Sequence, residues 1–192
     1  MIRISIQLHP PAHVAEHARA IRDVLWAHSL LLPRTDGKEY QPHLTLYAPG
    51  FPEHNEAKVI EVLEKFRSTV PPLRFVDARI ISYKRGYIAT MFVYSPEIRA
   101  FLSELLGAIN PLREGAILAH YLPGGRGYDA LTQQEHRNVE LYGHPDPIDS
   151  FTPHISFGKL KHDADEAPAR ELISWQIPEF VASDLAWTVV RA

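Results

Sequence analysis

The chain has 192 residues and a formal net charge of −3, and it contains no cysteine; 45% of its residues are hydrophobic and 22% are charged. This composition is ordinary for a soluble globular protein, and the length suffices for one solid domain or for two small lobes that share an interface. The lack of cysteine excludes disulfides, a thiol nucleophile and cysteine-ligated zinc, and the charge balance gives no general attraction to nucleic acid or anionic membrane.

The chain also lacks the usual signals of export and membrane insertion. Its longest apolar runs are far too short for a membrane span, and the N-terminus begins directly with a strand pattern instead of a secretory segment. We therefore expect a cytoplasmic protein, because a chain without cysteine is compatible with that compartment. No linker or low-complexity tract interrupts the sequence, so we expect residues 1–192 to form a single unit, a monomer with no obligatory protein partner.

The first half of the chain alternates between strand and helix patterns. In the first strand, Arg3, Ser5 and Gln7 occupy the polar face. A later helix begins with Ser95 as its N-cap and Pro96 in its first turn. The expected elements are strands at 2–8 and 43–47, helices at 12–28, 53–67 and 95–109, and a hairpin of strands 73–83 and 87–94 that turns at Lys84-Arg85-Gly86.

The second half begins with a segment that mixes weaker signals. A glycine-rich loop covers 123–127, and Thr132 with Glu135 forms a potential capping box for a short helix that would end at Gly143. The other expected elements are strands at 116–122, 152–159 and 181–190 and a helix at 168–175. This order predicts an α+β fold with two similar lobes of mainly antiparallel sheet, outer helices and a central cleft.

Two matching pentapeptides stand out, one in each half of the chain. Residues 42–46 read Pro-His-Leu-Thr-Leu and residues 153–157 read Pro-His-Ile-Ser-Phe. Because successive side chains of a strand point to opposite faces, His43 and Thr45 would share one face, as would His154 and Ser156. The apolar residues of each pentapeptide would anchor it in the core. Composition alone predicts roughly 0.2 such patterns in a chain of this kind, so two copies indicate a paired site.

Paired histidines and hydroxyls suit phosphoryl chemistry. Imidazole titrates near neutral pH, so one histidine can accept a proton while the other donates one. The hydroxyls of Thr45 and Ser156 can donate hydrogen bonds to phosphoryl oxygens and stabilise developing charge. Such a set supports in-line attack at phosphorus without a metal, and the sequence does not decide which histidine is the base.

The two pentapeptides resemble the paired His-x-Thr/Ser signatures of the 2H phosphoesterase superfamily, which includes the bacterial 2′-5′ RNA ligase/2′,3′-cyclic phosphodiesterases. The resemblance implies a bilobal fold, a metal-independent site in the cleft, no cofactor, and His43, Thr45, His154 and Ser156 as catalytic residues. It implies a nucleotide, an RNA end or a small cyclic phosphate as substrate. The acidic overall charge favours a small cyclic phosphate over long RNA, since affinity for a phosphate backbone comes mainly from basic groups.

Three further residues are candidates for substrate binding. Tyr47 falls on the same predicted strand face as His43 and either stacks on a ring at the cleft or covers the strand end. Arg126 lies in the glycine-rich loop, which is either a plain flexible loop or a lid over the substrate. Arg3 points either into the cleft or into solvent.

Two rival interpretations remain open at this level. A non-catalytic module that binds a nucleotide or RNA end would keep the same four motif residues. A metal-dependent hydrolase would use some of the 11 histidines, and residues 13–17 match the zinc-protease pattern H-x-x-E-H. No third ligand accompanies His13 and His17 in the sequence pattern, so exposed helix histidines are the simpler interpretation.

Overall fold

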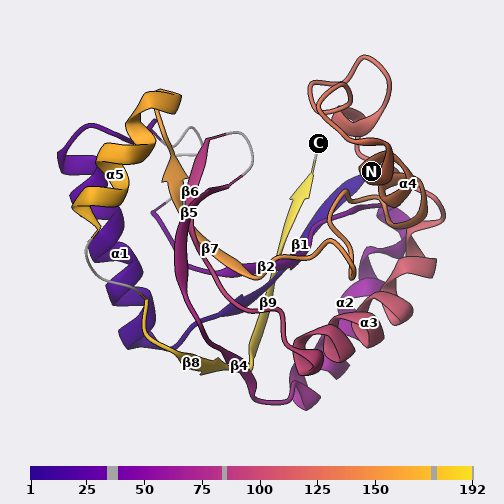
Figure 1. Ribbon diagram of the computed structural model, residues 1–192. Helices are drawn as coiled ribbons and strands as arrows, with labels where there is room; N and C mark the ends of the chain where they lie inside the picture. Colours follow the sequence, from indigo (N-terminus) through magenta and orange to yellow (C-terminus); the bar gives the residue numbers. More distant parts are fainter. Residues whose placement is uncertain (34–38, 84–85, 174–176, 192) are drawn as a thin grey trace.

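A mainly antiparallel sheet runs through the centre of the protein, with helices on its two flanks (Figure 1). The computed structural model describes residues 1–33, 39–83, 86–173 and 177–191. Within these residues the large sheet has the strand order β3-β1-β2-β7-β6-β5, with β9 also paired to β1. Its strands are β1 (Ile2–His9), β2 (Leu44–Tyr47), β3 (Gly50–Phe51), β5 (Arg79–Tyr83), β6 (Tyr87–Met91), β7 (His154–Lys159) and β9 (Asp184–Arg191).

The helices divide between the two halves of this sheet. Helices α1 (Ala12–Ala27) and α5 (Glu166–Leu172) flank the half formed by β5, β6 and β7, and α2 (Glu56–Thr69) packs on β9 in the other half (Figure 1). The remaining helices are α3 (Pro96–Ile109), which packs against α2, and α4 (Gln133–Tyr142). This arrangement confirms the predicted α+β class with antiparallel sheet and outer helices.

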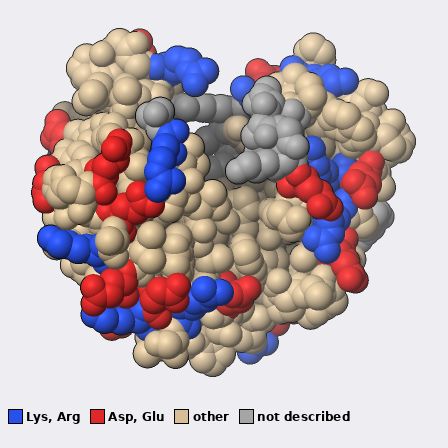
Figure 2. All heavy atoms as spheres, turned by 180° about the vertical axis from the view of Figure 1, so that it is seen from behind, with Lys and Arg blue, Asp and Glu red and all other residues tan. Residues whose placement is uncertain are grey.

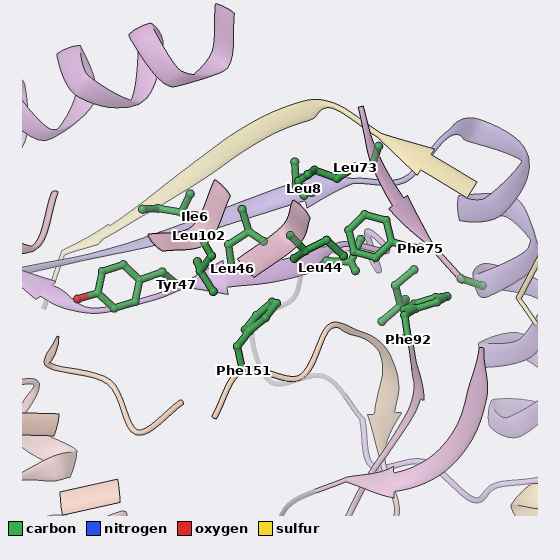
Figure 3. Packing of buried hydrophobic residues seen from close by; sticks show 14 of the residues in the cluster. Ile6, Leu8, Leu44, Leu46, Tyr47, Leu73, Phe75, Phe92, Leu102 and Phe151 are labelled. Carbon is green, nitrogen blue, oxygen red and sulfur yellow. The ribbon is translucent and has the colours of Figure 1, made fainter. Parts of the chain in front are cut away.

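Apolar alternation explains how the strands bury one face. The even-numbered residues of β1 from Ile2 to Leu8 are at most 1% exposed, whereas Arg3 on the other face is exposed. Figure 3 shows Ile6 and Leu8 packed beside Leu44 and Leu46 of β2. The sheet therefore presents one face to the core and leaves the other for polar side chains.

Local capping signals determine where two helices begin. The Ser95 hydroxyl accepts a hydrogen bond from the Ile98 backbone N–H, and α3 begins at the next residue. The capping box of Thr132 and Glu135 is formed at the start of α4, and Gly143 ends this helix with a φ of +66°. Both helices lie where the sequence places them.

The structure corrects three predicted strands. The strand expected at 73–83 is divided into β4 (Leu73–Phe75) and β5, because Asp77 adopts a left-handed conformation with a φ of +53°. The strand expected at 181–190 is likewise divided into β8 (Phe180–Ala182) and β9, and β8 pairs with β4 in a separate small sheet.

The strand expected at 116–122 is absent. Ala119–Tyr121 instead forms a 3₁₀ turn, in which local bonds from Tyr121 and Leu122 to residues three positions earlier replace a strand ladder. The last helix begins at Glu166 and ends at Leu172, earlier than expected, and Trp175 lies outside the described residues. Lys84 and Arg85 of the predicted hairpin turn, and residues 34–38 of the predicted loop, also lie outside the described residues. None of the described helices is both long and apolar enough to cross a membrane.

Candidate functional site

The two pentapeptides meet where the halves of the sheet join. Leu44 of β2 pairs with Ile155 of β7 in antiparallel register. Continuing that register sets His43 opposite Ser156 and Thr45 opposite His154, because antiparallel partners run in opposite directions. Leu44 and Ile155 are fully buried, so the four polar side chains that flank them share the other face of the sheet. Each histidine thus lies across from the hydroxyl of the other pentapeptide.

Each motif strand also carries a β-bulge at the last residue of its pentapeptide. Ile6 of β1 pairs with Tyr47 and Gln7 pairs with Thr45, which leaves Leu46 as the extra residue. In the other half, Ile88 of β6 pairs with Gly158 and Ala89 pairs with Ser156, which leaves Phe157 as the extra residue. The two strands are therefore alike in backbone geometry as well as in sequence, and a bulge beside a site re-aims the chain that follows it.

Hydrogen bonds to the backbone determine the tautomer of both motif histidines. The Nδ1 atom of His43 lies 2.7 Å from the Gln41 carbonyl oxygen, and that of His154 lies 2.8 Å from the Thr152 carbonyl oxygen. A carbonyl only accepts, so Nδ1 carries a proton in both rings. The nitrogen that gains or loses a proton near neutral pH is then Nε2 in both.

Burial changes the acidity of His154. Desolvation lowers the pKa of His154 below its ordinary value, although the hydrogen bond to Thr152 and the negative charge of Asp146 act in the opposite direction. His154 therefore favours the neutral form, in which Nε2 is a proton acceptor.

A cavity of about 1000 Å³ opens over this face of the sheet and is lined by all four motif side chains, His43, Thr45, His154 and Ser156. This volume is that of a ligand-sized site. One side of the cavity is formed by Arg22 of α1, by Leu32, Pro33 and Tyr40, and by the ends of β6 and β7, and the other by Tyr121, residues 130–132, Glu135 and residues 144–146.

Charges of both signs line the cavity. The cations are Arg3, Arg22 and Lys159, and the carboxylates are Glu135 and Asp146. On the outer face shown in Figure 2, basic and acidic side chains are intermixed. Positive charge for an anionic ligand is therefore provided locally, inside the cavity.

Tyr47 does not line the cavity. The bulge at Leu46 moves it from the cleft face to the face of Ile6, and it is only 1% exposed. Figure 3 shows its side chain near Leu46, at one end of the core residues that are drawn. Its hydroxyl donates to the Tyr142 carbonyl oxygen and lies 3.2 Å from Asn110 Oδ1, while burial raises its pKa. Simple strand alternation places Tyr47 on the cleft face, because alternation does not anticipate the extra residue of the bulge.

The other two candidates for substrate binding are separated by the structure. Arg3 lines the cavity from β1, whereas Arg126 is exposed and lies outside the cavity lining. The glycine-rich loop around Arg126 packs on its own segment, since a Cβ on Gly125 would lie 2.4 Å from the Ala119 carbonyl oxygen.

A buried guanidinium holds the end of α4 next to the cavity. Arg113 is 1% exposed and donates to the carbonyl oxygens of Leu141 and Ala116 at 3.0 and 2.7 Å. A Cβ on Gly143 would lie 2.5 Å from its Nε atom, so glycine is needed there for packing as well as for its positive φ. The next residue, His144, lines the cavity.

Several residues of the cavity wall are not predicted from the sequence. Arg22 follows Val14 and Ala18 at intervals of four residues, so a charge on the edge of the buried helix face was a signal that could have identified it. His144 and Asp146 follow α4 in an irregular loop, where no periodic pattern predicts a direction. The other missed polar or aromatic lining residues outside the pentapeptides are Tyr40, Tyr87, Tyr121, Thr132, Glu135, Phe151, Thr152 and Lys159.

Comparison with known proteins places most of the chain in one family. The family model described as the 2′-5′ RNA ligase superfamily matches residues 10–191. Among solved structures, Usb1 from Kluyveromyces marxianus is 13% identical, with a TM-score of 0.48 and coverage of 98% of this chain and 96% of that one. The same protein with uridine monophosphate is 12% identical, with a TM-score of 0.41 and the same coverage. Among curated proteins no match was found.

The family match spans both pentapeptides and the cavity wall between them. With nearly the whole length matched, the chain belongs to the 2′-5′ RNA ligase superfamily.

Proposed function

We propose that this protein is a metal-independent phosphodiesterase that opens a 2′,3′-cyclic phosphate or a related phosphodiester on a nucleotide, an RNA end or a small cyclic phosphate. The observation that carries this proposal is the antiparallel pairing of the two pentapeptides, which directs two histidines and two hydroxyls into one cavity. Family membership supports phosphoester chemistry of this general class.

In the proposed reaction one histidine acts as base and the other as acid. The neutral histidine takes a proton from water through Nε2 while the water oxygen attacks phosphorus. The bond from phosphorus to one ribose oxygen breaks, and the protonated histidine donates its proton to that oxygen. The product is a 2′- or 3′-phosphomonoester, and each histidine ends in the state in which the other began.

The hydroxyls and the local cations have separate tasks in this proposal. Thr45 and Ser156 donate hydrogen bonds to the non-bridging oxygens, where negative charge grows during attack. Arg3 lines the same cavity and adds long-range attraction for the anionic substrate.

The test is hydrolysis of a panel of 2′,3′-cyclic nucleotides and cyclic-phosphate-ended oligonucleotides in excess EDTA. Wild type is compared with His43→Ala and His154→Ala, and circular dichroism establishes that all three are folded. We expect turnover by wild type and a loss of about 100-fold or more in each variant, as acid–base catalysis predicts.

Other outcomes would favour the rival functions. Ligand binding by folded wild type without turnover of any substrate would favour a non-catalytic nucleotide-binding module. Activity that EDTA abolishes and zinc restores would favour a metal-dependent hydrolase. Turnover that survives both substitutions would show that the paired histidines are not the active site.

A further inference from the structure

Arg22, near the end of α1, reaches across to the second motif strand. Its Nη1 atom donates a hydrogen bond of 2.5 Å to the carbonyl oxygen of Phe157. Its guanidinium lies over the ring of Tyr40, 5.0 Å from the ring centroid, and the Tyr40 hydroxyl donates at 2.8 Å to the carbonyl oxygen of Ser156. Arg22 and Tyr40 thus bind two consecutive carbonyls of the second pentapeptide, and one of these carbonyls is that of Ser156.

The bulge in β7 explains why these carbonyls meet side chains. Phe157 is the extra residue opposite β6, so it has no position in the regular ladder. The adjoining Gly158 leaves room for the arginine, because a Cβ at that position would lie 2.9 Å from Arg22 Nη1. Bulge and glycine together let the guanidinium approach the backbone immediately after Ser156.

Among the residues that the structure describes, Arg22 has no acidic partner. Its side chain is half-buried and lines the cavity together with His154 and Ser156. Over residues 1–33, 39–83, 86–173 and 177–191, no carboxylate lies within ion-pair distance of it; its partners are a carbonyl and an aromatic ring. A half-buried cation held in this way favours an anionic ligand, and a guanidinium matches the geometry of phosphoryl oxygens.

We infer that Arg22 is a further catalytic residue, which contacts the phosphoryl group and stabilises the charge that develops there. Nη1 remains bonded to Phe157, and the other guanidinium N–H groups face the phosphoryl oxygens, since arginine has five N–H donors. The inference rests on the proposed function, and it adds next to Ser156 a positive charge that stays on the protein throughout the reaction, because a guanidinium does not give up its proton.

The experiment compares Arg22→Gln and Arg22→Lys with Arg19→Gln, a matched control one helical turn earlier on α1 and outside the cavity lining. Thermal melting checks folding. Steady-state kinetics with a 2′,3′-cyclic nucleotide gives kcat and KM, and calorimetry gives the Kd of inorganic phosphate. We expect Arg22→Gln to lower kcat/KM by about 100-fold, the effect of removing one preorganised charge-stabilising group.

The phosphate Kd distinguishes contact from positioning. If Arg22 contacts the phosphoryl group directly, phosphate binding weakens at least tenfold in Arg22→Gln. Arg22→Lys then retains part of the activity and part of the phosphate affinity, and Arg19→Gln matches wild type in both. A fall in kcat with unchanged phosphate binding would overturn direct contact and leave Arg22 only as a support of Ser156. If Arg22→Gln does not fold, the comparison of Arg22→Lys with wild type decides, because lysine keeps the charge but loses the planar fork.

The proposed function can fail separately from this inference. The wild-type protein could turn over no cyclic nucleotide and still bind phosphate in an Arg22-dependent manner. That result would refute the proposed substrate, but it would support an anion site at Arg22. Unchanged phosphate binding in folded Arg22→Gln, or no phosphate binding by wild type, would refute the inference whatever the outcome with cyclic nucleotides.

Discussion

At the scale of single residues, the site is built from two copies of the same local arrangement. Each motif histidine bonds through Nδ1 to the carbonyl two residues earlier, so the ring orientation is determined within the pentapeptide itself. Burial also lowers the pKa of His154. The neutral form of His154 is thereby favoured, which makes this ring a candidate for the base.

The first prediction concerns pH. We propose that His154 is the base in the forward reaction, since its lowered pKa keeps Nε2 unprotonated at neutral pH. The acid limb of kcat/KM should therefore have its midpoint below about 6.5, the ordinary histidine value. An NMR titration, assigned with His154→Gln, should give the same midpoint for this ring. A midpoint at or above the ordinary value would contradict the assignment.

The same shift has a consequence for stability with a definite sign. Between the lowered pKa in the folded state and the ordinary value in the unfolded state, the unfolded chain binds more protons. The free energy of unfolding should therefore decrease as the pH falls through this window. Urea unfolding of wild type and His154→Gln at several pH values measures this, and the substitution should reduce the pH dependence.

The second prediction concerns the hydroxyls. Thr45→Val removes the hydroxyl and keeps the shape of the side chain, whereas Thr45→Ser keeps the hydroxyl. We expect the valine variant to lose about 100-fold in kcat, because the bond strengthens as charge develops, and the serine variant to lose far less. A fall confined to KM would instead indicate that Thr45 binds ground state and transition state equally.

At the scale of elements, Gly143 at the end of α4 packs directly against the buried side chain of Arg113. Gly143 has a φ of +66°, and its missing Cβ leaves space for Arg113. This contact holds the C-terminal end of α4 in place. The residues that follow it, His144 and Asp146, line the cavity. The packing of Gly143 on Arg113 therefore positions the cavity wall that lies opposite α1.

The third prediction follows from this contact. Gly143→Ala should lower the free energy of unfolding by more than about 1 kcal/mol, because both the backbone conformation and the space oppose a methyl group. Gly107→Ala is the matched control: Gly107 lies within α3, and a Cβ there would meet nothing within 4 Å. The control should be stabilised by about 0.5–1 kcal/mol, the usual helix preference for alanine over glycine. Chemical denaturation of both variants tests the pair, and equal effects would refute the packing argument.

At the scale of the whole molecule, the site lies at the junction of two half-sheets. Leu44 and Ile155 join them, and helices cover the outer flanks (Figure 1). Neither half holds a complete site, because each contributes one histidine and one hydroxyl. The molecule has a net charge of −3 and intermixed charges on the face shown in Figure 2, whereas three cations line the cavity.

The fourth prediction is a shallow salt dependence of oligonucleotide binding. The cavity cations Arg3, Arg22 and Lys159 can neutralise few phosphates. For a single strand, the slope of log K against log salt should thus be about −2 or shallower, at about −0.7 per neutralised phosphate. Fluorescence titrations between 50 and 200 mM salt measure this slope, and a slope of about −4 or steeper would reveal a basic RNA track outside the cavity.

The sequence by itself determined the local elements and the candidate residues of the site. The alternation of Ile2, Ile4, Ile6 and Leu8, the Ser95 cap and the Thr132–Glu135 capping box are local patterns, and each element forms where its pattern predicts. Repetition of one pentapeptide was sufficient to select His43, Thr45, His154 and Ser156, because side-chain alternation in a strand depends only on its own residues.

Only the tertiary structure decided how these pieces meet. The pairing of Leu44 with Ile155 spans more than a hundred positions, and no local preference specifies it. The bulge at Leu46 exists only against β1, and it moved Tyr47 from the expected cleft to the core. Arg22 reaches Phe157 because α1 packs beside β7. Register, bulges and cavity walls depend on contacts between distant segments, and these form only when the chain has folded.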